Sequence, residues 1–233
     1  MKRMKTLTAG IFLLSQAFSG AALAASVTLS GATVDFTFDD AMLGLFGPAN
    51  VSGNSLYFTP TNFKAQSLNG AGFALTSETM NIKVSAHSDW LFSSIGLLEK
   101  GDYLLLGAGS MADVTGQMRI FDVATPLVDI TTSIVSTNPL NQTGLPTRNW
   151  NAMVSTDLSA WTTTQTINVT IENLLLASTG AMPSLAFVEK KFVGLSVVTA
   201  PIPEAETYAM MLVGLGLVGF AAMRRRAALK SIV

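Results

Sequence analysis

The sequence contains no cysteine and a single histidine among its 233 residues. Without cysteine there can be no disulfide bond, thiol catalysis or cysteine-based metal site. One histidine is too few for the zinc sites of proteins, which combine several histidine and cysteine ligands. A folded domain of this chain must therefore be stabilised by its hydrophobic core, for which roughly 175 residues are sufficient.

The single histidine, His87, also gives little support for an enzyme. It lies between Ser85 and Asp89, but adjacent residues of a strand face opposite ways, so sequence neighbours rarely form a catalytic relay. The sequence has no Gly-x-Ser-x-Gly nucleophile elbow. We therefore expect a protein that is not an enzyme, with His87 at the rim of the fold near a turn. A hydrolase that uses carboxylate chemistry is the remaining enzymatic alternative.

Positive charge is scarce in the middle of the chain. Residues 25–203 contain seven Lys and Arg against 13 Asp and Glu, a net charge of −6. Since a positive surface supplies most of the affinity for nucleic acid, we expect no nucleic-acid partner. The acidic residues that lie closest together in the sequence are Asp35, Asp39 and Asp40, and they do not form an Asp-x-Asp-x-Asp loop. We interpret them as solvated charges; a calcium site is the alternative.

A glycine pattern near the C-terminal end resembles a nucleotide site only in its spacing. Gly214, Gly216 and Gly219 fit Gly-x-Gly-x-x-Gly, which binds dinucleotides only between a strand and a helix. Here the pattern lies within an uninterrupted apolar run. We expect no cofactor.

The first 24 residues have the three parts of a secretory signal peptide. A positive start is followed by an apolar segment over residues 7–22, and Ala22 and Ala24 place small residues at positions −3 and −1 of a cleavage site. The positive residues are Lys2, Arg3 and Lys5. We predict export by the Sec machinery and cleavage by signal peptidase after Ala24; an uncut signal anchor is the alternative.

Three signals follow one another in residues 200–226. A Pro/Glu motif at 201–208 contains Pro201, Pro203 and Glu204, and an apolar run at 209–223 is free of charge and proline. The arginines that follow, Arg224, Arg225 and Arg226, favour the cytoplasmic side and stop transfer. A run of this length forms about 22 Å of helix against a hydrocarbon core of about 30 Å. Such a short span suits a transient hold, although an uncut transmembrane anchor is the alternative.

This order of signals resembles the PEP-CTERM sorting signal of exopolysaccharide-producing Gram-negative bacteria. The resemblance covers residues 201–226, with Pro203-Glu204 at its core; the commonest form has a second proline where this chain has Ala205. It implies recognition by an exosortase, a membrane protease that removes the tail and releases or transfers the protein at the cell surface. Residues 227–233 are then a short cytoplasmic end.

The body of the chain, residues 25–199, is rich in short segments with alternating apolar and polar residues. We predict strands over 34–38, 56–59, 80–86, 114–120, 130–135, 167–172 and 187–198. Turn residues separate them, including those at 99–102, and 138–150 is read as a surface loop. The predicted fold class is all-β, an antiparallel β-sandwich or jelly roll, flanked by a signal-peptide helix and a C-terminal transmembrane helix. A short helical turn is expected at 41–46.

Aromatic residues decide whether this body is suited to bind carbohydrate, because sugar faces stack on exposed rings. The candidates are Trp90, Trp150, Trp161, Tyr57 and Tyr103. Trp150 has the most polar neighbours and Trp161 comes second, so both are candidate glycan contacts; the alternative is that they belong to the core. Lys190 and Lys191 are interpreted as solvated lysines that protect an edge strand from aggregation.

These observations together predict an exported, non-enzymatic protein of the cell surface or exopolysaccharide matrix. Its partners would be signal peptidase, the Sec machinery, an exosortase-like protease, the membrane through its tail, and exopolysaccharide. It would be held transiently at the inner membrane before it reaches the surface. The alternatives are a carbohydrate-binding β-sandwich module and a simple membrane-anchored surface protein.

Overall fold

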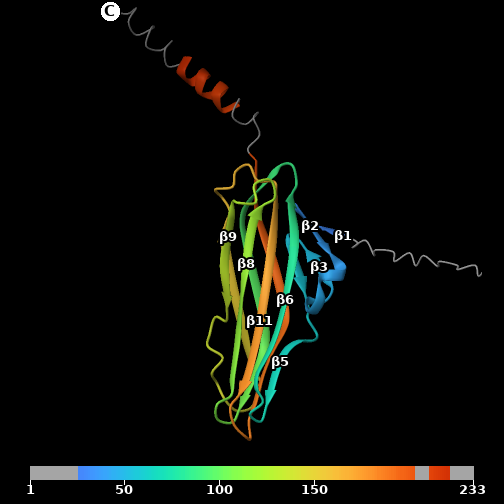
Figure 1. Ribbon diagram of the computed structural model, residues 1–233. Helices are drawn as coiled ribbons and strands as arrows, with labels where there is room; N and C mark the ends of the chain where they lie inside the picture. Colours follow the sequence, from blue (N-terminus) through green and yellow to red (C-terminus); the bar gives the residue numbers. More distant parts are fainter. Residues whose placement is uncertain (1–25, 203–209, 221–233) are drawn as a thin grey trace, which may run out of the picture.

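The computed structural model describes residues 26–202 and 210–220. Residues 26–202 form an elongated body of antiparallel strands (Figure 1). The strands are β1 (Ser26–Ser30), β2 (Val34–Asp39), β3 (Ala49–Ser52), β4 (Ser55–Phe58), β5 (Phe63–Leu68), β6 (Gly72–Ala86), β7 (Trp90–Leu106), β8 (Met111–Asp122), β9 (Asp129–Val135), β10 (Arg148–Asp157), β11 (Thr166–Thr179) and β12 (Leu185–Pro201). Two short 3-10 helices, η1 (Asp40–Met42) and η2 (Gly44–Phe46), occupy the region where a helical turn was predicted.

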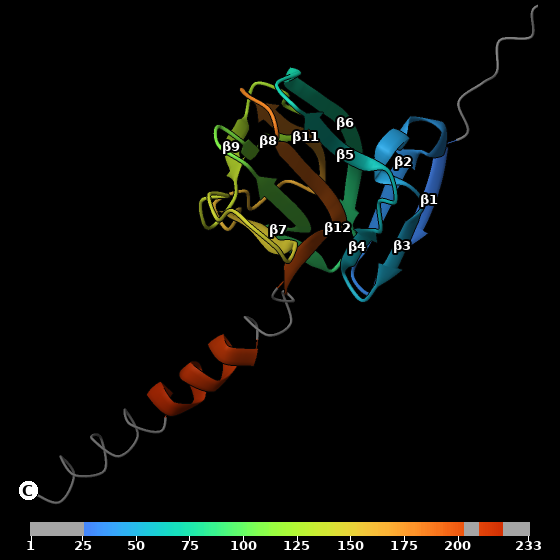
Figure 2. The same cartoon turned by 90° about the horizontal axis from the view of Figure 1, so that it is seen from below.

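The strands make two sheets that enclose one core. One sheet has the order β1-β2-β6-β11-β8-β9, and the other has the order β10-β7-β12-β4-β3, with β5 also paired to β12. Figure 2 shows β8 and β11 across the interior from β7. The predicted all-β class is therefore confirmed, in a β-sandwich-like form.

Four long strands, β6, β7, β11 and β12, run most of the length of the body (Figure 1). Strand β7 has 17 residues, which corresponds to about 56 Å at 3.3 Å per residue. Strand β11 alternates between buried and half-buried residues along most of its length, so that Val169, Ile171 and Leu175 all enter the core. Period-two alternation correctly predicted parts of β6, β11 and β12, because each sheet has one face on the core, whereas no strand was predicted over β7.

The turn predicted at residues 99–102 is wrong, because these residues lie in the middle of β7. The sequence predicts Gly101 as a turn residue, but in the structure it marks a place where neighbouring strands come very close. A Cβ atom at this position would lie 1.8 Å from the carbonyl oxygen of Glu189 and 2.7 Å from the indole of Trp150. A glycine within a strand often marks such a close approach of another backbone segment. A single sequence does not distinguish this glycine from one in a turn.

Strand β12 contains a β-bulge that changes which residues face the core. Lys190 pairs with Gly101 and Phe192 pairs with Lys100, so Lys191 is the extra residue. Lys190 is 0% exposed, and β12 lies between β7 and β4, so the prediction of a solvated edge-strand lysine is wrong for Lys190. Lys191 is exposed and forms an ion pair with Asp102.

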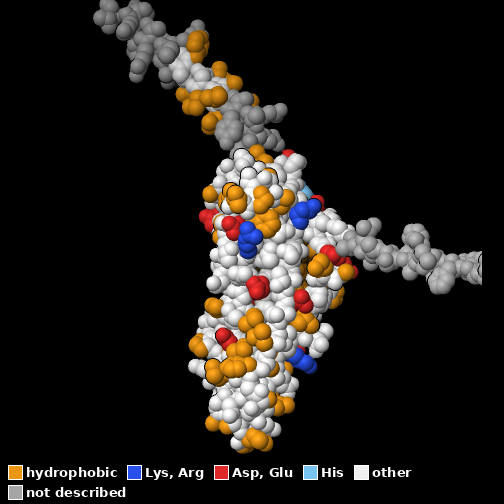
Figure 3. All heavy atoms as spheres, viewed as in Figure 1, with side chains coloured by type: hydrophobic (Ala, Val, Ile, Leu, Met, Phe, Trp, Pro, Cys, Tyr) orange, Lys and Arg blue, Asp and Glu red, His pale blue; other side chains and the backbone are white. Residues whose placement is uncertain are grey.

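Residues 210–220 form a helix whose side chains are exposed (Figure 3). Within the described parts of the chain, none of the helices has the length and apolar character that a membrane crossing requires. The predicted transmembrane helix is thus described only over this segment. The predicted signal-peptide helix lies outside the described residues, as do the cleavage residues Ala22 and Ala24.

Candidate functional site

The sorting motif begins inside the last strand of the domain. Pro201 is the last residue of β12 and pairs with Trp90 on β7. The next residue, Ile202, donates its backbone N–H to the carbonyl oxygen of Asp89 at 2.8 Å. The start of the motif is therefore held on the sheet by backbone pairing. Pro203, Glu204 and the arginines Arg224, Arg225 and Arg226 lie outside the described residues.

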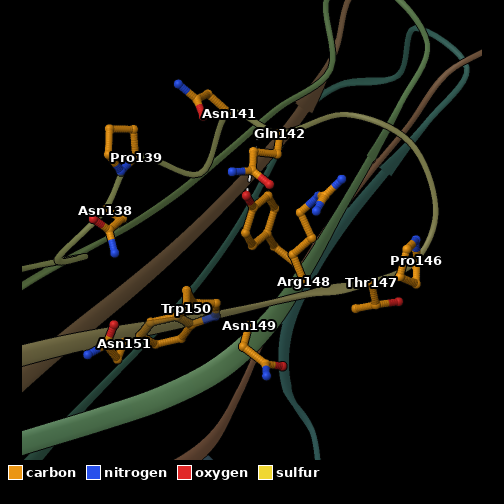
Figure 4. Close-up of a pocket in the computed structure, with 11 residues that line it drawn as sticks. Asn138, Pro139, Asn141, Gln142, Pro146, Thr147, Arg148, Asn149, Trp150 and Asn151 are labelled. Atoms are coloured by element: carbon orange, nitrogen blue, oxygen red, sulfur yellow. Dashed lines mark hydrogen bonds between the residues drawn. The ribbon is translucent and has the colours of Figure 1, made fainter.

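A polar hollow of about 530 Å³ lies between the 138–147 loop and β10 (Figure 4). Its wall includes several side-chain amides, and Tyr103 accepts a hydrogen bond from the backbone N–H of Gln142 at 3.4 Å. The amide residues are Asn138, Asn141, Gln142, Asn149 and Asn151. Figure 4 shows Trp150 at the base of this group. The polar lining of this hollow can form hydrogen bonds with a hydroxyl-rich ligand.

Trp150 itself belongs mostly to the core. It is 5% exposed, and its indole Nε1 donates to the carbonyl oxygen of Glu189 at 3.1 Å. The lack of a side chain at Gly101 makes room for the ring. A ring buried in this way has no open face for a sugar, which favours the core alternative for Trp150. Trp161 is half-buried and packs against the core from its edge.

A more accessible aromatic pair lies on the outer face of the sheet that contains β12. The rings of Tyr57 and Phe192 are stacked, with centroids 6.4 Å apart and an interplanar angle of 20°. Phe192 lies over Gly194, where a Cβ atom would be 2.8 Å from the nearest ring atom of Phe192. The Nζ atom of Lys100 is 5.9 Å from the Phe192 centroid. We name Tyr57, Phe192 and Lys100 the outer platform.

Two shallow hollows adjoin the outer platform. One of about 460 Å³ includes Lys100, Asn149 and Asn151 in its lining, and one of about 310 Å³ includes Tyr57 and Ser196. Phe192 lines both. Tyr57 was among the aromatic candidates in the sequence, whereas Phe192 was not, because only the bulge in β12 turns its ring outward.

His87 lies near a turn, as predicted, and contacts Asp35 rather than Asp89. Its Nε2 is 3.3 Å from Oδ1 of Asp35, and both side chains are partly exposed. A hydrogen bond from Ser30, and then the contact with His87, lower the pKa of Asp35 below its usual range. Asp39 accepts a hydrogen bond from the backbone of Ala41. Within residues 26–202 and 210–220, no three His, Cys, Asp or Glu side chains are grouped to hold a metal ion.

Comparison with known proteins gives a family match at the C-terminal end and distant structural similarity over the β body. Residues 201–226 match the family model of the PEP-CTERM protein-sorting motif. No curated protein matches the chain. Among solved structures, TmCBM61 in complex with β-1,4-galactotriose is similar at a TM-score of 0.22 and 10% identity, over 65% of this chain and 90% of that one.

Two viral structures are similarly distant. The infectious bursal disease virus Gx strain gives a TM-score of 0.28 and 14% identity over 69% of this chain and 45% of that chain. The enzymatically active domain of bacteriophage CBA120 tailspike protein 4 gives a TM-score of 0.21 and 9% identity, over 74% of this chain and 19% of that chain. These TM-scores are too low to assign the β body to the fold of any of the three. Residues 201–226 therefore carry a PEP-CTERM protein-sorting motif, which directly follows an all-β body.

Proposed function

We propose that the β body is a cell-surface or exopolysaccharide-matrix protein that an exosortase releases by removing the sorting tail. The PEP-CTERM motif implies export and processing by this membrane protease. The observation that carries the proposal is the continuity of β12 with the motif, since Pro201 is still paired with Trp90. With almost no linker, the body stays next to the membrane until the tail is cut.

In this proposal the apolar run and the arginines provide a transient hold at the inner membrane. Each arginine at the centre of a membrane helix costs about 2.5–3.5 kcal/mol, so three together oppose transfer strongly. The short apolar run makes the same hold easy to release. The body is then delivered to the surface, and we assign it no enzymatic activity.

Replacing Arg224, Arg225 and Arg226 together with Ser should abolish processing, because the tail would no longer stop in the membrane. We expect full-length protein past the inner membrane, measured by intact mass of the protein from cells and medium. Cells that lack the exosortase provide the unprocessed reference. Lys230→Ser is the matched control and should be processed normally. Normal processing of the triple variant would contradict the proposed hold.

The outer platform supports a second candidate function, the binding of a polysaccharide. The rings of Tyr57 and Phe192 are nearly parallel and only partly buried, so they present apolar surface against which a pyranose face can stack. Asn149 and Asn151 line the hollow beside it and can donate and accept hydrogen bonds with sugar hydroxyls. We propose a glycan chain as the ligand, lying across β4, β12, β7 and β10.

Phe192→Ala should weaken polysaccharide binding by about tenfold, equivalent to about 1.4 kcal/mol, because a stacking surface is lost. The measurement is affinity electrophoresis of the full chain in gels that contain exopolysaccharide from the producing cells. Phe73→Ala is the control, because Phe73 is 77% exposed on the other sheet. Equal binding by wild type and Phe192→Ala would contradict the outer platform as the binding site.

A further inference from the structure

Three polar side chains meet in the centre of the core. Lys190 of β12, Glu99 of β7 and Asn173 of β11 are each 0% exposed. The Nζ atom of Lys190 contacts Oε2 of Glu99 and Oδ1 of Asn173. Lys190 and Glu99 come from one sheet and Asn173 from the other, so the lysine bridges the two layers.

Aromatic rings close this site on further sides. The Nζ atom of Lys190 is 5.4 Å from the ring centroid of Phe63 and 5.8 Å from that of Trp150. Burial lowers the pKa of Lys190 below its usual range, although the carboxylate of Glu99 opposes the change. A larger fraction of the neutral amine is then present, and the neutral amine is the nucleophilic form of lysine.

A structural ion pair alone explains the cluster incompletely. Buried charges are usually retained only where their remaining polar atoms are hydrogen-bonded as well. Within the part of the chain that the structure describes, neither Oε1 of Glu99 nor Nδ2 of Asn173 has a hydrogen-bond partner. If the amide of Asn173 reacted, Oε1 of Glu99 would be free to carry a proton, and Nδ2 of Asn173 would be the atom that leaves as ammonia.

We propose that Lys190 and Asn173 become joined by an intramolecular isopeptide bond, with Glu99 as the catalytic proton carrier. The three groups contain everything that the reaction requires: an amine, a carboxamide and a carboxylate in contact with the amine. The inference rests on the core of the β body and is independent of the sorting tail and of polysaccharide binding.

The reaction balances without an external reagent. Glu99 takes a proton from the Lys190 ammonium, and the neutral Nζ attacks Cγ of Asn173. Glu99 gives its proton to Nδ2 of Asn173 and takes a second proton from Nζ. The Cγ–Nδ2 bond breaks, the Nζ–Cγ bond remains, and ammonia leaves. Glu99 ends protonated and can pass that proton to the ammonia.

Such a bond would connect the two sheets covalently in a chain without cysteine. It would join β11 to β12 through residues 173 and 190 and so restrict the unfolded chain, as a disulfide bond does. This cross-link would act in the environment outside the cell, where exported proteins commonly rely on disulfide bonds.

Trypsin makes the bond directly measurable. The sequence has no Lys or Arg between Arg148 and Lys190, so both linked residues fall in one peptide that begins at Asn149. Because an acylated lysine is not cleaved, we expect a peptide 149–191 that is lighter than its sequence mass by about 17 Da, the mass of ammonia. Tandem mass spectrometry should show no backbone fragments from cleavage between residues 173 and 190. The sample is the full chain as isolated from the producing cells.

A Glu99→Gln variant tests the role of the carboxylate, because Gln keeps the shape but cannot carry the proton. We expect its digest to contain peptide 149–190 with the unmodified mass. Asp102→Asn is the control, since Asp102 is on the same strand but pairs with the exposed Lys191, and it should keep the link.

Three outcomes would overturn the proposal. Unmodified peptide 149–190 from the wild-type chain would show that no bond forms. A loss of about 18 Da, with Lys190 joined to a peptide that contains Glu99, would identify a different acceptor and the release of water. An intact link in Glu99→Gln would remove Glu99 from the catalytic role. The wild-type digest decides the first two even if the variant fails to fold.

Discussion

Gly101→Ala is expected to destabilise the β body by about 3 kcal/mol or more, an upper-range effect for overpacking a core with one methyl group. The added Cβ atom would stand 1.8 Å from the carbonyl oxygen of Glu189, which is backbone and cannot rotate away. It would also displace the indole of Trp150. Urea denaturation of the purified protein, followed by circular dichroism, measures the change in the free energy of unfolding.

Gly96→Ala is the matched control on the same strand. The nearest atom to a Cβ at Gly96 is the hydroxyl oxygen of Ser196, at 2.9 Å, and this side chain can rotate to another rotamer. We therefore expect a loss below about 1 kcal/mol. Equal losses for the two variants would mean that the close approach of β12 at Gly101 is not what requires glycine there.

Trp150→Ala is expected to lower the free energy of unfolding by about 3–5 kcal/mol, because a buried indole is replaced by a cavity. The variant also loses the hydrogen bond from Nε1 to Glu189. Trp161→Ala should lose about 1–2 kcal/mol, since that ring is half-buried. The same urea measurement compares the two variants.

This comparison also separates the two interpretations of Trp150. If Trp150→Ala kept wild-type stability and lost only polysaccharide binding, the ring would be a glycan contact and its assignment to the core would be wrong. A large loss of stability, together with weaker binding in Phe192→Ala, would instead place any glycan on the outer platform.

Much of the sheet structure is already visible in the sequence. Alternation over residues 80–86 and 167–172 corresponds to parts of β6 and β11, and the Ser52-Gly53-Asn54 turn joins β3 to β4. Alternation also places Asn173 in phase with the buried Ile171 and Leu175. That phase is a sign, visible in the sequence, of a polar residue in the core.

The partners of Asn173 were harder to predict. The sequence predicts Glu99 within a turn, because a glycine such as Gly101 is typical of turns. In the structure Gly101 instead lies in β7, where it leaves room for the neighbouring strands. The sequence predicts a solvated Lys190, because exposed lysines commonly protect edge strands from aggregation. The meeting of these residues depends on how β7, β11 and β12 pack, which no local pattern records.

The sequence by itself determined the sorting motif and the all-β class, because a motif and a period of two are properties of neighbouring residues. The tertiary structure decided that Lys190 faces inward, that Phe192 faces outward and that Trp150 is buried. The physical reason is the bulge at Lys191 and the close approach of β12 to Gly101, both of which depend on the partner strand.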